Sequence, residues 1–163
     1  MATITATTDY FQVELYSLAI APDLAQTRLL IPLGDIAEII TVERREICPL
    51  PGVPKGVTGV LNLRGQLIWV MDLRMVQGQV DRRGRPNPQE KITIVLLQSA
   101  NGQIGCLVTT LMGITACDLT ELTVVDLPLQ KKYPFCMGQL ALAHGNRGML
   151  LDTALLLSHL QSI

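Results

Sequence analysis

Apolar and polar residues alternate with a period close to two along most of this chain. The pattern is present in six runs: 10–16, 28–33, 65–71, 91–97, 103–108 and 147–151. Successive side chains of a strand point to opposite faces, so this period predicts half-buried β-strands. Apolar runs also flank the segment 62–65, Asn-Leu-Arg-Gly, which predicts an exposed turn. Many short strands separated by glycine and proline indicate a barrel or a sandwich.

Helical periodicity is confined to short segments. Residues 35–42 predict a turn or two of helix, because their isoleucines recur at helical spacing. Asp72 and Asp152 are each placed to cap a short helix. The first of these helices is expected to end at Gly78, and the second is expected to be the C-terminal helix of the chain.

Two segments predict flexible connections. Residues 1–8 are rich in threonine and alanine, and they predict a flexible leader before a single domain over 9–163. Residues 78–90 are polar and rich in arginine, proline and glycine, which favours a linker. We expect the boundary between two related halves of the domain to lie in this linker.

A shared spacing indicates that the two halves arose by internal duplication. Each half has a glycine seven residues before an aspartate, with mainly apolar residues between: Gly65 and Asp72, then Gly145 and Asp152. Upstream, segment 59–63 matches segment 138–142. Arg64 in the first copy corresponds to His144 in the second.

The composition favours a globular chain with protein partners. Its 163 residues suffice for one domain, or for two very small ones that share a core. Hydrophobic residues make up 48% and charged residues 17%, which predicts apolar surface beyond the needs of a monomer. The formal net charge of −1 offers no basic field to hold nucleic acid. Apolar runs end within about ten residues, short of the ~20 that a membrane-spanning helix needs.

The residue inventory argues against catalysis and metal binding. The cysteines, at 48, 106, 117 and 136, include no Cys-x-x-Cys pair, and the histidines, at 144 and 159, lack ligand-like spacing. We expect the thiols to be reduced in a cytoplasmic protein. The sequence has no Gly-x-Ser-x-Gly, P-loop or Gly-x-Gly-x-x-Gly motif. We therefore expect neither enzyme activity nor a cofactor nor a metal.

The first half resembles the CheW family, the adaptors of bacterial chemosensory arrays. The matched residues are a helical-turn motif at 36–39, the prolines 51 and 54, the turn residues Gly59, Asn62, Arg64 and Gly65, and Asp72-Leu73-Arg74. In the second half, 104–108 and Leu151-Asp152 match more loosely. The resemblance spans about residues 9–160, nearly the whole chain.

This resemblance implies a mainly β fold, with two SH3-like five-stranded β-barrels packed together, short helices and a C-terminal helix. It also implies a non-catalytic cytoplasmic adaptor, which couples the cytoplasmic tip of a methyl-accepting chemoreceptor to the regulatory domain of a CheA-type histidine kinase. The output would be chemotaxis, or pilus or gliding motility. Two rivals stay open: a CheW-like regulator that binds only one of these partners, and a small-molecule-binding β-barrel.

The resemblance places receptor contacts at Arg64, Glu38 and Asn62. A guanidinium at a tight turn can bind a carboxylate through two hydrogen bonds. That carboxylate could belong to a partner, or to Glu38 or Asp72 in an internal pair. We expect Glu38 to point outward from its helical turn. A solvated residue with no partner is the alternative for Glu38.

Kinase contacts are expected at Leu30, Ile31 and Trp69, through strand edges that could pair with a kinase barrel. Ordinary core strands are the alternative there. Among the structural residues, Gly59 and Gly65 are expected to permit turns, and Asp72 and Asp152 to cap helices.

Three features depart from the CheW pattern. Thr109 stands where the family usually has aspartate, and Trp69 where it commonly has proline. Residues 22–26 lengthen the first hairpin. We expect these departures to affect the choice of partner rather than the fold.

Overall fold

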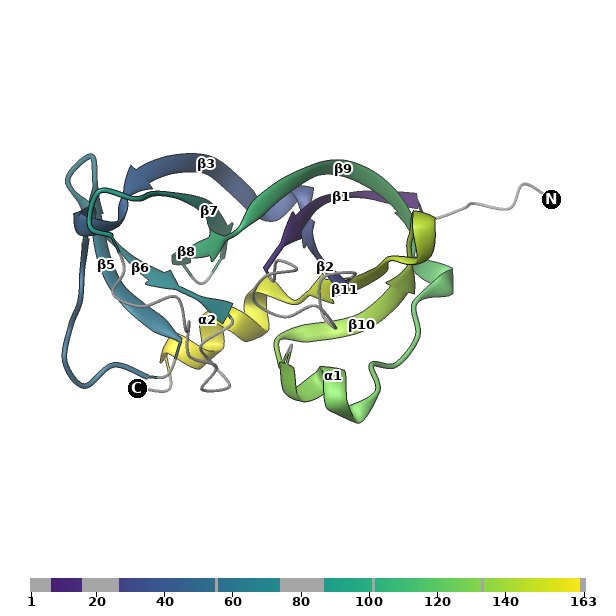
Figure 1. Cartoon of the computed structure of the whole chain (residues 1–163). Helices are drawn as coiled ribbons and strands as arrows, with labels where there is room; N and C mark the ends of the chain where they lie inside the picture. Colours follow the sequence, from purple (N-terminus) through teal and green to yellow (C-terminus); the bar gives the residue numbers. More distant parts are fainter. Residues whose placement is uncertain are drawn as a thin grey trace.

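The computed structural model describes residues 7–15, 27–54, 56–73, 87–100, 102–132 and 134–161. These residues are mainly β-strand and form two sheets, each curled into a barrel-like half (Figure 1). The two halves lie side by side, and the C-terminal helix lies mainly beside the half that is built from the middle of the chain. The predicted fold class is confirmed.

The first sheet, called barrel A here, combines the two ends of the chain. It contains β1 (Thr7–Glu14), β2 (Thr27–Pro32), β9 (Thr110–Asp118), β10 (Cys136–Ala141) and β11 (Arg147–Leu151), in the order β10-β11-β2-β1-β9. Short helix α1 (Leu127–Lys132) precedes β10, and α2 (Thr153–Gln161) follows β11. Barrel A is therefore discontinuous in sequence.

The second sheet, called barrel B here, is built from the middle of the chain. It contains β3 (Ile36–Glu43), β4 (Ile47–Cys48), β5 (Val57–Leu63), β6 (Gln66–Met71), β7 (Lys91–Ser99) and β8 (Gly102–Val108), in the order β3-β7-β8-β6-β5-β4. Apart from the two-residue β4, it has the same number of strands as barrel A.

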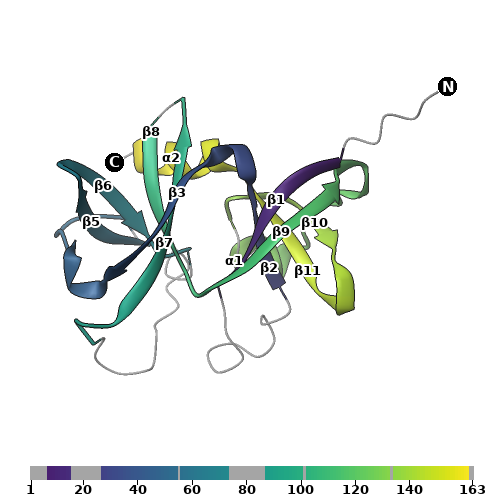
Figure 2. The ribbon, with the colours of Figure 1, turned by 90° about the horizontal axis from the view of Figure 1, so that it is seen from above.

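Both barrels follow one topology. In each, one pair of neighbouring strands is parallel: β6 with β8 in barrel B, and β11 with β2 in barrel A. The strand order β3-β7-β8-β6-β5 of barrel B then corresponds to β9-β1-β2-β11-β10 of barrel A. The second copy thus borrows its last two strands from the N-terminal part of the chain, and Figure 2 shows β1 and β9 side by side in it.

Three apolar clusters hold the molecule together. The interior of barrel B is filled by Ile47, Leu61, Ile68, Val70, Ile92, Ile94, Leu96 and Leu107. The interior of barrel A is filled by Tyr10, Leu30, Cys117, Leu140 and Leu150. The third cluster is the largest and draws on both sheets and on α2; its members include Val13, Leu29, Val95, Leu97, Cys106, Met149 and Leu156. We call it the inter-barrel core, and its size explains why the two halves form one body.

The helix predicted over 35–42 is wrong, because Ile36–Glu43 is strand β3. It pairs antiparallel with β7, and Ile40 lies opposite Ile94. Ile39 packs on the inter-barrel core, whereas Ile40 packs on the interior of barrel B. A strand that is apolar on both faces produces the same isoleucine spacing as a helix, and its β-branched residues favour the strand.

Other expectations fall partly outside the described residues. These are residues 1–6 of the leader, the 22–26 insertion, the short helix after Asp72 and residues 78–86 of the linker. Residues 87–90 form a turn that leads into β7. Helix α1 and strands β9 and β10 were not among the runs that the alternation predicted.

Candidate partner-binding site

The β5–β6 hairpin is closed by a loop of two residues, Arg64 and Gly65. The ladder continues up to the pair Leu63 and Gln66, so only these two residues remain to reverse the chain. Both have positive φ, 50° and 86° respectively. A two-residue loop with two positive φ angles matches the twist of the flanking strands, and it prefers asparagine or glycine. Arginine is an unfavourable residue for the first of these positions.

The Arg64 side chain reaches across to β3 and binds Glu38. Arg64 Nη2 lies 2.5 Å from Glu38 Oε2, and Nη1 donates to Oε1 at 3.3 Å. The two residues are 26 positions apart, and their strands are distant in the order of the sheet. The geometry is the two-pronged guanidinium–carboxylate pair expected for arginine. Glu38, rather than Asp72, is therefore the internal carboxylate that pairs with Arg64.

The pair remains open to solvent. The Arg64 side chain is 70% exposed and that of Glu38 is 36% exposed. The hydrogen bond from Arg64 lowers the pKa of Glu38 below its ordinary value, although partial burial of the carboxyl group opposes this shift. The same hydrogen bond raises the pKa of Arg64. Glu38 is therefore an anion at neutral pH, and a partner carboxylate can approach the exposed guanidinium.

Asn62 lies at the base of the same turn. Its Oδ1 accepts a hydrogen bond from the Gly65 N–H at 3.0 Å, and the residue is exposed. The three residues predicted to contact a receptor are thus brought together at one site. Asn62 differs from the other two, because its side chain is engaged with the turn itself.

The residues predicted to contact a kinase are less accessible. Leu30 and Ile31 have no exposed surface, and their strand β2 lies inside its sheet between β11 and β1. Trp69 is half-buried on β6, between β8 and β5, and packs against the inter-barrel core. Of the three, only Trp69 offers surface to another protein in this structure.

The predicted turn and cap residues occupy structural positions. A Cβ atom on Gly59 would lie 2.2 Å from the carbonyl oxygen of Cys48, which leaves room only for hydrogen. Asp152 Oδ1 accepts the N–H of Leu155 at 3.0 Å, at the start of α2. Asp72 is buried, and its N–H donates to the Gly56 carbonyl at 2.7 Å.

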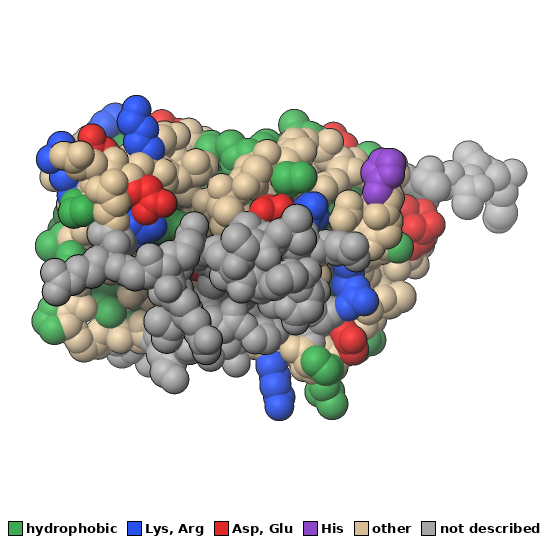
Figure 3. Space-filling model, in the orientation of Figure 1, with side chains coloured by type: hydrophobic (Ala, Val, Ile, Leu, Met, Phe, Trp, Pro, Cys, Tyr) green, Lys and Arg blue, Asp and Glu red, His purple; other side chains and the backbone are tan. Residues whose placement is uncertain are grey.

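An apolar surface on strand β9 escaped the sequence analysis. Leu111, Met112 and Ile114 are 41%, 45% and 61% exposed, on the strand that forms one edge of barrel A. Figure 3 shows hydrophobic side chains along the face over β3 and β9. The available signal was the absence of any charged residue from 110 to 117. An exposed, uncharged edge strand is typical of a protein-binding surface.

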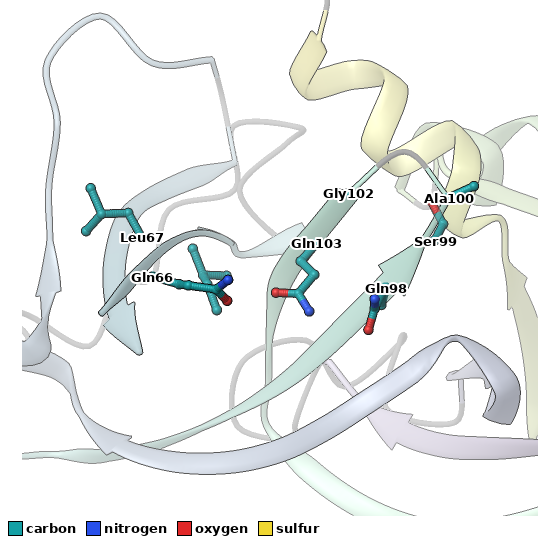
Figure 4. A pocket seen from close by; sticks show the side chains of 8 residues that line it. Gln66, Leu67, Gln98, Ser99, Ala100, Gly102 and Gln103 are labelled. Atoms are coloured by element: carbon teal, nitrogen blue, oxygen red, sulfur yellow. The ribbon is translucent and has the colours of Figure 1, made fainter. Parts of the chain in front are cut away.

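A shallow hollow lies where β6 begins and the β7–β8 hairpin turns (Figure 4). Its lining is uncharged and contains three exposed glutamines, at 66, 98 and 103. The exposed Leu67 lies at its rim. The described lining residues include one hydroxyl group, on Ser99, but no histidine, lysine or carboxylate that could act as its base.

The described part of the chain was predicted to contain neither a metal site nor a disulfide. No group of three or more His, Cys, Asp or Glu residues there is placed to hold a metal ion. All four cysteines are free, and burial raises the pKa of Cys106 to about 12, so its thiol stays protonated at neutral pH. No helix in this part of the chain is long and apolar enough to cross a membrane.

Comparisons with known proteins agree with this architecture. The model of the CheW-like domain family matches residues 21–161. The crystal structure of the scaffolding protein TtCheW from Thermoanaerobacter tengcongensis is similar, with a TM-score of 0.64 and 18% sequence identity. The match covers 90% of this chain and 84% of that one. Comparison with curated protein sequences finds no match.

Proposed function

The chain belongs to the CheW-like domain family, and we propose that it is a non-catalytic cytoplasmic adaptor that couples chemoreceptors to a CheA-type histidine kinase. The similar fold of a scaffolding protein supports this proposal. The proposed mechanism is differential binding: contacts with receptor and kinase hold both in one assembly and bias the kinase between its states. Weak single contacts suffice, because an array multiplies them.

One observation carries the proposal, namely the exposed arginine in the left-handed loop at position 64. The backbone there favours asparagine or glycine, so arginine costs stability that its exposed ion pair recovers only in part. Residues held against a backbone preference are concentrated at functional sites. We assign Arg64 to the receptor contact, and we assign Glu38 the role of holding the Arg64 guanidinium in position.

The kinase contact is proposed for the part of barrel B that bears Trp69. Leu30 and Ile31 lie on β2 of barrel A and have no exposed surface, so they are not part of the proposed contact. The uncharged apolar surface on β9 is a further place where a protein partner could bind.

The substitution Arg64→Asn tests the receptor assignment. Asparagine tolerates the left-handed conformation, so the variant should be at least as stable as the wild type. Receptor coupling should fall about tenfold or more, because a charge-assisted bond is lost. The measurement is cosedimentation of kinase with a receptor cytoplasmic fragment, together with urea unfolding. Arg147→Asn, which removes another exposed arginine with a carboxylate partner, is the matched control.

A charge swap separates a partner contact from a purely internal pair. The double variant Glu38→Arg, Arg64→Glu rebuilds the ion pair with its charges exchanged. We expect coupling to stay low, because the cation has left the turn. Full recovery would show that only the internal pair matters, and the receptor assignment would be wrong.

A protein that binds receptor or kinase, but never both together, would be a regulator rather than an adaptor.

A further inference from the structure

The loop that carries Arg64 needs a restraint from outside itself. Both of its residues adopt positive φ, and one of them carries a long charged side chain. Without a restraint, a non-glycine residue returns readily to the broader right-handed and extended regions. A change of φ at Arg64 would swing the guanidinium away from β3.

We propose that Asn62 is the positioning residue of this site, and that its side chain holds the loop so that Arg64 faces Glu38. Asn62 Oδ1 accepts the Gly65 N–H at 3.0 Å, directly after Arg64. The bond joins Asn62, near the end of β5, to Gly65, the second loop residue. It therefore restrains the chain on both sides of Arg64. This inference rests on the proposed role of Arg64.

Barrel A provides an internal comparison. Its β10–β11 connection also contains a left-handed pair, His144 and Gly145, with φ of 61° and 74°. In that loop the Leu142 N–H donates to the Asn146 carbonyl at 2.8 Å, and the Asn146 N–H donates to the Ala143 carbonyl at 3.2 Å.

The position matched to Asn62 in barrel A is Ala141, which has no hydrogen-bonding side chain. A left-handed pair can therefore form without an asparagine clamp. Among the described residues, the Asn62–Gly65 hydrogen bond and the Arg64–Glu38 ion pair occur together in barrel B. Neither has a counterpart among the described residues at the corresponding loop of barrel A. This association links Asn62 to the presentation of Arg64, rather than to turn formation in general.

The first test uses the titration of Glu38, which needs no partner protein. NMR gives the pKa of Glu38 in the wild type, in Asn62→Ala and in Asn62→Ser. We expect the pKa to rise toward its ordinary value in Asn62→Ala, because Arg64 leaves the carboxylate. Asn62→Ser should restore part of the shift, since a serine hydroxyl accepts such bonds more weakly. An unchanged pKa in Asn62→Ala would overturn the proposal.

The second test measures receptor coupling with the same variants. We expect Asn62→Ala to weaken coupling about three- to tenfold, the usual effect of one lost hydrogen bond, and Asn62→Ser to weaken it less. In an Arg64→Ala background, Asn62→Ala should cause no further loss, because there is no guanidinium left to position. An equal loss in both backgrounds would show that Asn62 contacts the receptor directly, and would overturn the positioning role.

The two tests fail in different ways. If the Glu38 pKa responds to Asn62 but no variant alters coupling, the positioning holds and the receptor assignment of Arg64 is wrong. If coupling depends on Arg64 but the Glu38 pKa is the same in Asn62→Ala as in the wild type, the receptor assignment holds and the positioning role is wrong.

Discussion

Barrel B can close at Gly59 only because this residue has no side chain. This residue follows an irregularity in the β5–β6 ladder, and the Cys48 backbone passes directly over it. A methyl group there would meet a carbonyl oxygen at 2.2 Å and a carbonyl carbon at 2.7 Å. Backbone atoms cannot turn aside as a flexible side chain can, so β4 and β5 would have to separate.

We predict that Gly59→Ala lowers the free energy of unfolding by about 3 kcal/mol. Gly34→Ala is the control, because a Cβ at Gly34 has no atom within 4 Å among its described surroundings. Equilibrium urea unfolding of the two variants measures the difference. Equal stability of the two would mean that β4 moves away at little cost.

At the scale of elements, the junction between β8 and β9 ties the two barrels together. Thr109 lies at this crossing, and its N–H donates to the Glu14 carbonyl at 2.8 Å. Its hydroxyl donates to the Leu15 carbonyl at 2.9 Å. An ionised aspartate, which the resemblance to the CheW pattern leads one to expect at this position, cannot donate such a bond. Thr109 therefore ties the start of β9 to the end of β1 through two hydrogen bonds at the crossing between the barrels.

We predict that Thr109→Val lowers the free energy of unfolding by about 1 kcal/mol, because the part-buried Leu15 carbonyl loses its hydroxyl donor. Valine keeps the shape of threonine, so packing is preserved. Thr110→Val, at the exposed next position, is the matched control and should change stability little. Thermal unfolding followed by circular dichroism gives both values. A larger loss at position 110 would contradict this account.

At the scale of the whole molecule, the inter-barrel core makes the two halves one cooperative unit. The shared cluster takes side chains from both sheets and from α2, and it is larger than either barrel interior. Neither half would keep its buried apolar surface covered if the other unfolded. The protein should therefore unfold in a single transition.

We predict that Leu97→Ala, in the inter-barrel core, lowers the free energy of unfolding by about 2–5 kcal/mol and leaves the transition single. The chain has one tryptophan, Trp69 on β6 of barrel B, so its fluorescence reports on that barrel and on the adjoining inter-barrel core. Far-ultraviolet circular dichroism reports on the strands of both barrels. The two signals should change at the same urea concentration. Separate midpoints would show that the barrels unfold independently.

The sequence alone determined what depends on neighbours along the chain. The alternation located most strands, the Asn-Leu-Arg-Gly segment located the turn, and the paired glycine–aspartate spacing indicated two copies. Each of these signals arises within a few residues, where strand geometry and turn preference act directly. Strand β9 gave no such signal, because its apolar side chains lie on an exposed edge rather than on one buried face.

Tertiary structure decided what depends on residues far apart. It made 36–43 a strand by placing it beside β7, and it completed barrel A with strands from the N-terminal part of the chain. It also chose Glu38 over Asp72 as the partner of Arg64, because β3 passes within reach of the turn while Asp72 is buried. Such choices follow from the closing of each sheet into a barrel, which no local pattern encodes.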